Sequence, residues 1–451
     1  MPKAAHASQI DEQDTQRLKN IAEDILSEAK KQGADQVEAA ISVGQGLSVN
    51  ARLGEVETIE FHKDQGVGIT VYKGQKKGSA SSTKLDMASI KDMVSAACSI
   101  AHYAEDDPYS GLPDATLLAT DFPDLSLHHP WAVSAEQAIE MAIECENSAR
   151  FYDKRITNSE GAGIQSFEGT RVLANSLGFN HGYPASRHSM SCSVIGGSDD
   201  TMQRDYWYTV ARKASDLESA LKVGEMAAKR TVERLGARSI STRKCPVMFA
   251  AEVSGGLIGH FISAIRGGNL YRKSSFLLDS LQQQVFPDFI NIYEQPLLPQ
   301  AMGSSAYDSE GVATALRNIV EQGVVQAYVL SSYSARKLGM KSTANAGGVH
   351  NLTVQAGELN FQQMLQEMNT GLLVTELIGQ GVNTLTGDYS RGAAGYWVEN
   401  GEIQFPVEEV TIAGNLKDIY QSIVAVGNDV ELRGNTRTGS ILVAEMTLAG
   451  S

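Results

Sequence analysis

The segment 246–269, PVMFAAEVSGGLIGHFISAIRGGN, constrains the fold of this chain most strongly. Its apolar run at 247–250 has the length of one buried strand, and a glycine pair at 255–256 interrupts the run. Apolar residues then recur at helical spacing until a second glycine pair at 267–268. We therefore predict a strand, a glycine turn and a short apolar helix that carries side chains past the end of a sheet.

His260 is the polar side chain of that apolar helix. A histidine on an apolar face is most often a core residue with one hydrogen-bond partner, because buried polar groups usually find partners. The alternative is a ligand or catalytic role, since imidazole binds metals and exchanges protons near neutral pH. The residues alone favour the core interpretation.

The size and charge of the chain exclude several classes of protein. With 451 residues it can form two or three domains with a sizeable core. Lys and Arg number 38 and Asp and Glu 53, so the net charge of −15 should repel nucleic acids and anionic membranes. No apolar run approaches the roughly 20 residues that span a bilayer, and the polar start lacks the apolar core of a signal peptide. We expect a cytoplasmic protein that binds neither nucleic acid nor membranes.

The four cysteines, Cys98, Cys145, Cys192 and Cys245, lie far apart in the sequence and form no C-x-x-C motif. A disulfide framework or a cysteine-rich zinc site is therefore not expected. We predict buried free thiols.

The N-terminal half is predicted to contain two helix–sheet–helix segments. In the first, a helical stripe from Leu18 to Ala29 precedes short strands that include 47–52, 56–61 and 67–72, and a helix from about Met87 to Tyr103 follows. Glycines at 46, 54, 66, 74 and 78 punctuate the strands, which indicates an antiparallel meander.

In the second segment, a capping box of Ser134 and Gln137 predicts the start of a helix, and strands and turns follow across 155–212. A second capping box, Ser215 with Glu218, predicts the start of the closing helix. The repeated element order suggests structural duplication, although no convincing sequence repeat accompanies it.

The C-terminal region is predicted to be mostly β, with one clear helix at Phe361–Met368. Segments 332–339, 344–348 and 387–392 have the composition of surface loops. The fold class expected for the whole chain is α+β: antiparallel meander sheets flanked by helices in the N-terminal half, with a mainly β C-terminal domain. We place the domains at 1–125, 126–240 and 241–451.

Two short motifs resemble those of serine enzymes but lack their context. Ser334 and Lys337 fit the S-x-x-K pattern, yet the companion S-D-N and K-T-G motifs are absent, so a nucleophilic Ser334 is the weakest functional hypothesis. In 387–392, Asp388 stands where a nucleophile elbow has its first glycine. The favoured interpretations are a loop whose Arg336 and Lys337 hold carboxylates or a peptide end, and a glycine-bounded turn.

Local spacing predicts no zinc site. The nine histidines include no H-x-x-x-H and no H-E pair. A site assembled from distant residues, such as His260, His350 and a carboxylate, stays open.

Several sequence blocks, in the order found in one known family, extend over nearly the whole chain. They are 78–83 (GSASST), 272–274 (RKS), 276–280 (FLLDS), 333–339 (YSARKLG), 387–392 (GDYSRG), 397–402 (WVENGE) and 412–416 (IAGNL). The chain therefore resembles the TldD/TldE (PmbA) family.

The resemblance bears directly on the helix in 246–269. The active member of that family has a His-Glu-x-x-x-His helix here, in which two imidazoles hold Zn²⁺ and the Glu is the general base. Gly259, His260 and Ala264 stand at those positions, and Thr438 stands near the position of a late cysteine ligand. The chain thus resembles the TldE (PmbA) branch, which has the fold without the zinc ligands.

The resemblance implies a subunit of a zinc metalloprotease. TldD and TldE pair into a heterodimer that cleaves unfolded or flexible peptides reached through its interior, and the family is linked to maturation of a peptide antibiotic (microcin), to breakdown of an antitoxin and to an older label, modulator of DNA gyrase. We expect no cofactor in this chain, zinc in a TldD-type partner, and no activity of the isolated chain. Peptide binding is expected at Asp388, Tyr389, Ser390 and Arg391. Whether the chain pairs with itself when the partner is missing stays open.

Two further hypotheses remain beside the metalloprotease subunit. The chain could be a non-enzymatic peptide-binding or regulatory protein, as the gyrase label suggests, and would then bind its target without any partner subunit. A serine hydrolase at Ser334 would lose its activity in a Ser334→Ala variant. Co-purification from the native host distinguishes the first two hypotheses best.

Overall fold

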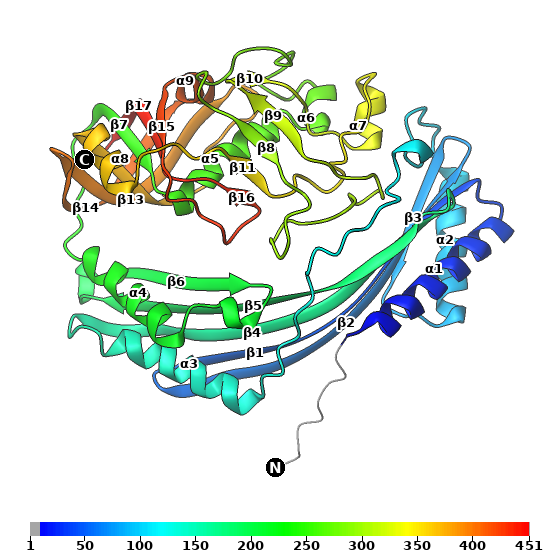
Figure 1. Cartoon of the computed structure of the whole chain (residues 1–451), viewed down its shortest axis with the longest axis horizontal. Helices are drawn as coiled ribbons and strands as arrows, with labels where there is room; N and C mark the ends of the chain where they lie inside the picture. Colours follow the sequence, from blue (N-terminus) through cyan, green and yellow to red (C-terminus); the bar gives the residue numbers. More distant parts are fainter. Residues whose placement is uncertain (1–9, 451) are drawn as a thin grey trace.

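The computed structural model describes residues 10–450, which form a long curved sheet and a C-terminal unit packed against its concave face (Figure 1). The sheet has six antiparallel strands in the order β3-β2-β1-β4-β5-β6. The strands are β1 (Gln36–Arg52), β2 (Glu55–Lys73), β3 (Lys76–Ser82), β4 (Ile156–Asn175), β5 (Asn180–Gly196) and β6 (Gln203–Ala211). Because β1 pairs with β4, both halves of the N-terminal region share one continuous sheet.

Four helices cover the convex face of this sheet. They are α1 (Glu12–Lys31), α2 (Met87–Tyr103), α3 (Ala135–Arg150) and α4 (Ala220–Glu233). Helices α1 and α2 close one apolar core over β1 and β2, and α3 and α4 close another over β4 and β5. Each half therefore contributes a helix, three strands and a helix, which is the repeated order expected from the sequence.

The bounds of two helices confirm the sequence predictions. Helix α2 spans the predicted residues, and α3 begins after Ser134, whose hydroxyl accepts the Gln137 N–H at 3.2 Å while Gln137 Oε1 accepts the Ser134 N–H at 3.0 Å. The predicted start of the next helix is wrong, because α4 is capped by Ser219 rather than Ser215. Glu218 cannot complete a capping box, since its carboxylate accepts the indole N–H of Trp207 at 2.6 Å.

The predicted short strands of the first segment are also wrong, because β1 and β2 are continuous strands of 17 and 19 residues. Gly54 and Gly74 make turns at positive φ, but Gly46 and Gly66 lie inside strands. A Cβ at Gly46 would lie 2.7 Å from the Ser166 carbonyl oxygen, so this glycine permits close strand packing rather than a turn.

The C-terminal unit contains two sheets and five helices among the described residues. One sheet has the order β14-β13-β12-β7-β17-β15 and the other β10-β9-β8-β11-β16. The strands are β7 (Arg243–Phe249), β8 (Ile292–Glu294), β9 (Arg317–Glu321), β10 (Val324–Val325), β11 (Leu352–Val354), β12 (Gly371–Ile378), β13 (Asp388–Glu399), β14 (Glu402–Asn415), β15 (Ile423–Val426), β16 (Thr436–Arg437) and β17 (Ile441–Ala449). The helices are α5 (Ala251–Ala264), α6 (Gly267–Tyr271), α7 (Ser332–Lys337), α8 (Phe361–Met368) and α9 (Leu416–Gln421).

This sheet-rich unit confirms the expected α+β class and the predicted helix α8, whereas two predicted loops are wrong. Residues 332–337 form α7, in which Ser332 and Ala335 are buried, and 388–392 belong to β13. Residues 344–348 have no regular structure, but Asn345 is 3% exposed, so this segment lies inside the unit. Tertiary contacts outweigh the loop-like composition in 332–337 and 388–392.

Polar groups of the N-terminal region contact the C-terminal unit at two places. In the segment that follows α2, the carbonyl oxygens of Tyr109 and Gly111 accept from Arg336 of α7 at 3.0 Å each. On β5 of the long sheet, the Tyr183 hydroxyl lies 2.7 Å from that of Ser305. These contacts join the N-terminal region and the C-terminal unit.

Two predictions from composition can be compared with the described residues. Cys98, Cys145, Cys192 and Cys245 are free and buried, which confirms the expectation of buried thiols. Within residues 10–450, no helix has the length and apolarity needed to cross a membrane.

Candidate functional site

Helix α5 leaves the sheet directly at the end of β7. The N–H of Ala250 donates to Val374 of β12 at 3.0 Å, and the Ala250 carbonyl accepts the first helical hydrogen bonds, so α5 begins at Ala251. Gly255 and Gly256 therefore lie inside the helix, and the predicted glycine turn is wrong. Each glycine costs a helix about 1 kcal/mol relative to alanine. Contacts with the sheet and with the segment after β16 outweigh this cost.

The segment around position 438, near which the resemblance places a late ligand, contacts α5. The Ser254 hydroxyl of α5 donates to the Gly439 carbonyl at 2.9 Å. Thr438 is fully buried, and its hydroxyl donates to the same carbonyl at 3.1 Å. A Cβ at Gly255 would lie 3.6 Å from Thr436, so the helix packs closely on this segment.

His260 is half-buried on α5, and its Nε2 atom is buried without a hydrogen-bond partner. The expected hydrogen-bond partner of a core histidine is thus absent at this atom. The imidazole contacts the Tyr389 ring edge-on, with ring centroids 5.9 Å apart. Burial lowers the pKa of His260, and the charge of Arg391 lowers it further. A neutral imidazole therefore faces strand β13.

The residues at the implied metal positions do not fit a zinc ion. The side chains of Gly259 and Ala264 contain no atom that can bind a metal. Gly259 is exposed, whereas Ala264 is fully buried. Across residues 10–450, no three His, Cys, Asp or Glu side chains form a group suited to a metal. A catalytic zinc site needs three protein ligands, and His260 supplies one candidate nitrogen.

The four residues predicted to bind peptide lie on strand β13 rather than in a turn. Successive side chains of a strand point to opposite faces. Tyr389 is buried, and Arg391 is half-buried, toward α5, whereas Asp388 and Ser390 are exposed. Asp388 accepts the Thr386 hydroxyl at 2.6 Å and so closes its own turn. The structure brings Tyr389 and Arg391 to His260, and peptide binding by the four residues stays a prediction.

A charged cleft of about 440 Å³ separates α5 and β12 from α4 and β6. Arg391 lines it from β13. On its floor, Arg230 donates to Asp205 at 3.2 Å and to Glu252 of α5 at 3.3 Å. Arg234 lies 3.4 Å from Asp205 and 2.5 Å from Glu376 of β12.

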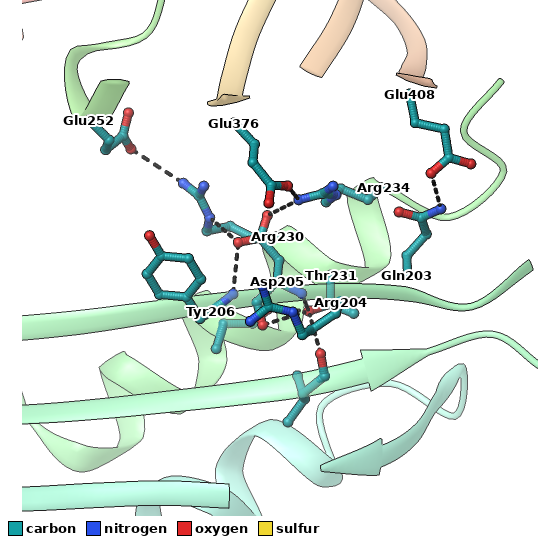
Figure 2. A network of polar contacts seen from close by, with 12 residues as sticks. Gln203, Arg204, Asp205, Tyr206, Arg230, Thr231, Arg234, Glu252, Glu376 and Glu408 are labelled. Atoms are coloured by element: carbon teal, nitrogen blue, oxygen red, sulfur yellow. Dashed lines mark hydrogen bonds and ion pairs between the residues drawn. The ribbon is translucent and has the colours of Figure 1, made fainter. Parts of the chain in front are cut away.

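Figure 2 shows Glu252 and Glu376 reaching from the C-terminal unit to Arg230 of α4 and to Arg234 directly after it. Burial disfavours the charge of Arg230, but the carboxylates of Asp205 and Glu252 outweigh burial and raise its pKa. The side chain of Asp205 is 5% exposed. The carboxylates therefore compensate the charges of the arginines, and these ion pairs connect α4 to the C-terminal unit.

Strand β6 borders the cleft with an unpaired edge. It is the last strand of the six-stranded sheet, and no described strand pairs with its outer side. Arg433 lies 4.2 Å from the ring of Trp207 and 4.4 Å from that of Tyr208, and it also pairs with Glu431. The Asp205 N–H on this strand donates to the Thr231 hydroxyl at 3.1 Å, and the Tyr208 carbonyl accepts from Arg433 at 2.9 Å. The cleft thus combines the remaining backbone groups of β6 with a charged wall.

Ser334 is a helix-capping residue. It is 5% exposed, its hydroxyl accepts the Ser331 N–H at 3.0 Å, and it donates to the Ser331 carbonyl at 3.2 Å. Lys337 lies 3.8 Å from Asp107. Of the favoured alternative, a loop whose Arg336 and Lys337 hold carboxylates or a peptide end, Lys337 lies beside a carboxylate, whereas Arg336 donates to backbone carbonyls and the segment is a helix.

The sequence interpretation missed the network around Asp205. The arginines and the carboxylates that bind them are 22 to 142 residues apart along the chain, and no local pattern joins them. The spacing of Arg230 and Arg234 on one face of α4 is the signal that could have been found, because residues four apart share a helix face. Their acidic partners could not be identified without the fold.

The sequence matches three family models that follow one another along the chain. These are PmbA/TldA metallopeptidase domain 1 at residues 37–101, the central domain at 128–235 and the C-terminal domain at 242–450. Together they cover most of the chain.

The chain is similar to proteins of known name along nearly their whole length. Metalloprotease PmbA of Escherichia coli O157:H7 is 53% identical over 94% of each chain. A Haemophilus influenzae metalloprotease TldD homologue is 24% identical over 93% of this chain and 90% of its own length. The crystal structure of a putative modulator of DNA gyrase from Bacteroides thetaiotaomicron matches with a TM-score of 0.92 and 26% identity, over 96% of this chain and 99% of that one.

Proposed function

The chain belongs to the PmbA/TldA metallopeptidase family, and we propose that it is the subunit that binds peptide without holding the zinc. In this proposal a TldD-type paralogous subunit holds the metal and forms a heterodimer with the chain in the cytoplasm. The complex cleaves unfolded or flexible peptides. Maturation of peptide antibiotics and degradation of antitoxins are the activities that the resemblance suggests.

One observation supports this division of work. The resemblance aligns helix α5 with the family's metal-binding helix, and α5 offers one imidazole where a zinc peptidase needs three ligands and a general base. The pKa of that imidazole is lowered, so it is mainly neutral near pH 7. No step of peptide hydrolysis can be assigned to the described residues of this helix.

The cleft between α5 and β6 is the proposed peptide site of this chain. An extended peptide can pair with the outer edge of β6 as a further strand. Main-chain hydrogen bonds would then bind peptides of many different sequences. Arg391 reaches the cleft from β13, whose partners β12 and β14 hold it in place. The subunit would then present a peptide to the metal of the other subunit.

Reconstitution tests this proposal. The purified chain should contain no stoichiometric zinc and should not digest casein, and activity should appear when a TldD-type subunit is added. Chelator-sensitive digestion of casein by the chain alone would refute the proposal.

The second candidate is a peptide-binding or regulatory protein without any enzymatic partner. The name of the Bacteroides thetaiotaomicron relative, putative modulator of DNA gyrase, favours testing it. Co-purification from the native host separates the two candidates. A TldD-type subunit recovered with the chain supports the metalloprotease complex, and recovery of a target without that subunit supports the regulator.

A further inference from the structure

A second cavity, of about 540 Å³, lies between the concave face of the long sheet and the loop 305–309 of the C-terminal unit. Its floor includes two small residues in register on neighbouring strands, Gly169 of β4 and Ala185 of β5. A Cβ at Gly169 would lie 2.9 Å from the Val43 carbonyl oxygen and 3.2 Å from the Phe167 ring, so glycine keeps this part of the floor free of a side chain.

Two arginines stand at the ends of this floor. Arg171 of β4 lies opposite Tyr183 of β5, and Arg187 of β5 lies opposite Phe167 of β4. The two arginines are therefore four residues apart along neighbouring strands, on the same face of the sheet. Four residues of a strand span about 13 Å. Both arginine side chains are exposed to the cavity region, and neither lies within 4.0 Å of a carboxylate in residues 10–450.

A third arginine lies behind them with its charge uncompensated. Arg212 donates to the carbonyl oxygens of Ser186 at 3.0 Å and Met302 at 2.9 Å, and its Nε is buried without an acceptor. Burial lowers the pKa of Arg212, and the nearby charge of Arg187 lowers it further. An anion in the cavity would relieve this unfavourable charge.

The acidic groups nearby do not neutralise the arginines. Asp308 lines the cavity, but its carboxylate accepts the backbone N–H groups of Glu310, Val312 and Ala346. Burial raises the pKa of Asp308 to about 7, and that of Glu38 on the same sheet face to about 7. Three arginines thus line the cavity beside carboxyl groups that are only partly ionised near pH 7, although the whole chain carries −15.

We propose that this cavity binds the carboxylates of an extended acidic peptide through Arg171 and Arg187, with Arg212 behind them. A guanidinium group binds a carboxylate through two parallel hydrogen bonds, and Tyr183 and Tyr307 offer an aromatic wall for the peptide backbone. The separation of the two arginines fits acidic side chains four residues apart. The proposed function enters only in the choice of a peptide as the ligand.

Calorimetry with a synthetic peptide tests the proposal. The probe is a nine-residue peptide of Gly, Ala and Ser with two glutamates four residues apart, acetylated and amidated at its ends. It should bind the full chain, and the double variant Arg171→Gln with Arg187→Gln should weaken binding by about tenfold or more. Arg266→Gln is the control, because Arg266 is also exposed and pairs with no described carboxylate, yet lies outside the cavity lining. It should leave binding unchanged.

Two further peptides identify the source of the carboxylate. The first replaces both glutamates by glutamine, and the second is this neutral peptide with a free C-terminus. Binding of the diglutamate peptide alone assigns the site to acidic side chains, and binding of the neutral free-acid peptide assigns it to a chain end. Binding of the neutral amidated peptide as tightly as the diglutamate peptide would overturn the proposal, as would unaltered affinity in the double variant.

A pair of variants at Ala185 isolates charge from shape. Ala185→Glu places a carboxylate on the floor between the two arginines, and Ala185→Gln has nearly the same shape without charge. The glutamate variant should bind the acidic peptide several-fold more weakly than the glutamine variant, and equal affinities would contradict the proposal. Thermal unfolding checks that each variant is folded. Failure of these tests leaves the reconstitution experiment with a TldD-type subunit unaffected, so the two proposals can fail separately.

Discussion

The cleft beside α5 and the cavity beneath loop 305–309 both contain arginines, but only the cleft has arginines that are paired with carboxylates among the described residues. In the cleft, Arg230 and Arg234 are bound by carboxylates from three different elements. In the cavity, Arg171 and Arg187 have no described carboxylate within ion-pair distance. The comparison teaches that the first pair of arginines holds the molecule together, whereas the second pair remains free for a ligand.

The largest effect is expected from removing the acid that the two cleft arginines share. Asp205→Ala leaves Arg230 and Arg234 partly buried with less compensation, and breaking a buried pair costs about 3–5 kcal/mol. Urea unfolding should show a loss of free energy in this range. If the variant were as stable as the parent, the cleft network would not be structural.

The matched control uses an exposed ion pair. Lys244 and Glu445 lie 3.0 Å apart with side chains 66% and 59% exposed. Solvent screens such pairs, so Glu445→Ala should change the free energy of unfolding by less than about 1 kcal/mol. A comparable loss in both variants would remove the distinction between buried and surface pairs.

A smaller effect on the free energy of unfolding is expected when the pH changes, because two acids near the cavity titrate. Burial, followed by the charge of Glu310, raises the pKa of Glu38 from 4.5 to about 7. Between pH 4.5 and about 7 the folded chain therefore retains a proton that the unfolded chain has released. The free energy of unfolding falls as the pH rises through this range. Asp308, whose pKa is also raised to about 7 mainly by burial, acts in the same direction.

Glu38→Gln removes the contribution of one of these acids. Its unfolding free energy should fall less between pH 5 and pH 8 than that of the parent, by on the order of 1 kcal/mol. Urea unfolding at several pH values measures the difference. Identical pH profiles for parent and variant would show that Glu38 titrates normally in the folded chain.

The smallest effect is expected at His260. Its Nε2 has no hydrogen-bond partner, and the proposed function gives it no part in hydrolysis. His260→Gln should therefore leave kcat/KM of the reconstituted complex within about twofold of the parent, less than the hundredfold typical of a lost general base. A hundredfold fall in kcat at unchanged KM would identify His260 as a participant in the chemistry.

The sequence predicted the parts of the fold that depend on local chemistry. Helices α2 and α3 were predicted because apolar periodicity and the Ser134 capping box are local signals. The two glycines of α5 misled the prediction, since contacts with β12 and with the segment after β16 decide where that helix begins. Contacts with distant strands also explain the wrong prediction of a turn at 387–392, since 388–392 belong to strand β13.

The candidate site was predictable in one respect only. Position 260 could be placed on an apolar helix by spacing, but the Tyr389 ring beside it and the Asp205 network beneath it come from distant segments. The arginine cavity was not predicted at all, because strand register alone brings Arg171 and Arg187 to one face. Such sites depend on which strands become neighbours.

The central claim is that α5 retains the position of a metal-binding helix without its ligands. The most direct test is the zinc content of the purified chain, measured by mass spectrometry of the metal after dialysis, alone and in complex with a TldD-type subunit. We predict no bound zinc in the isolated chain and one zinc ion per heterodimer. One zinc ion per isolated chain, lost in the His260→Gln variant, would contradict the account.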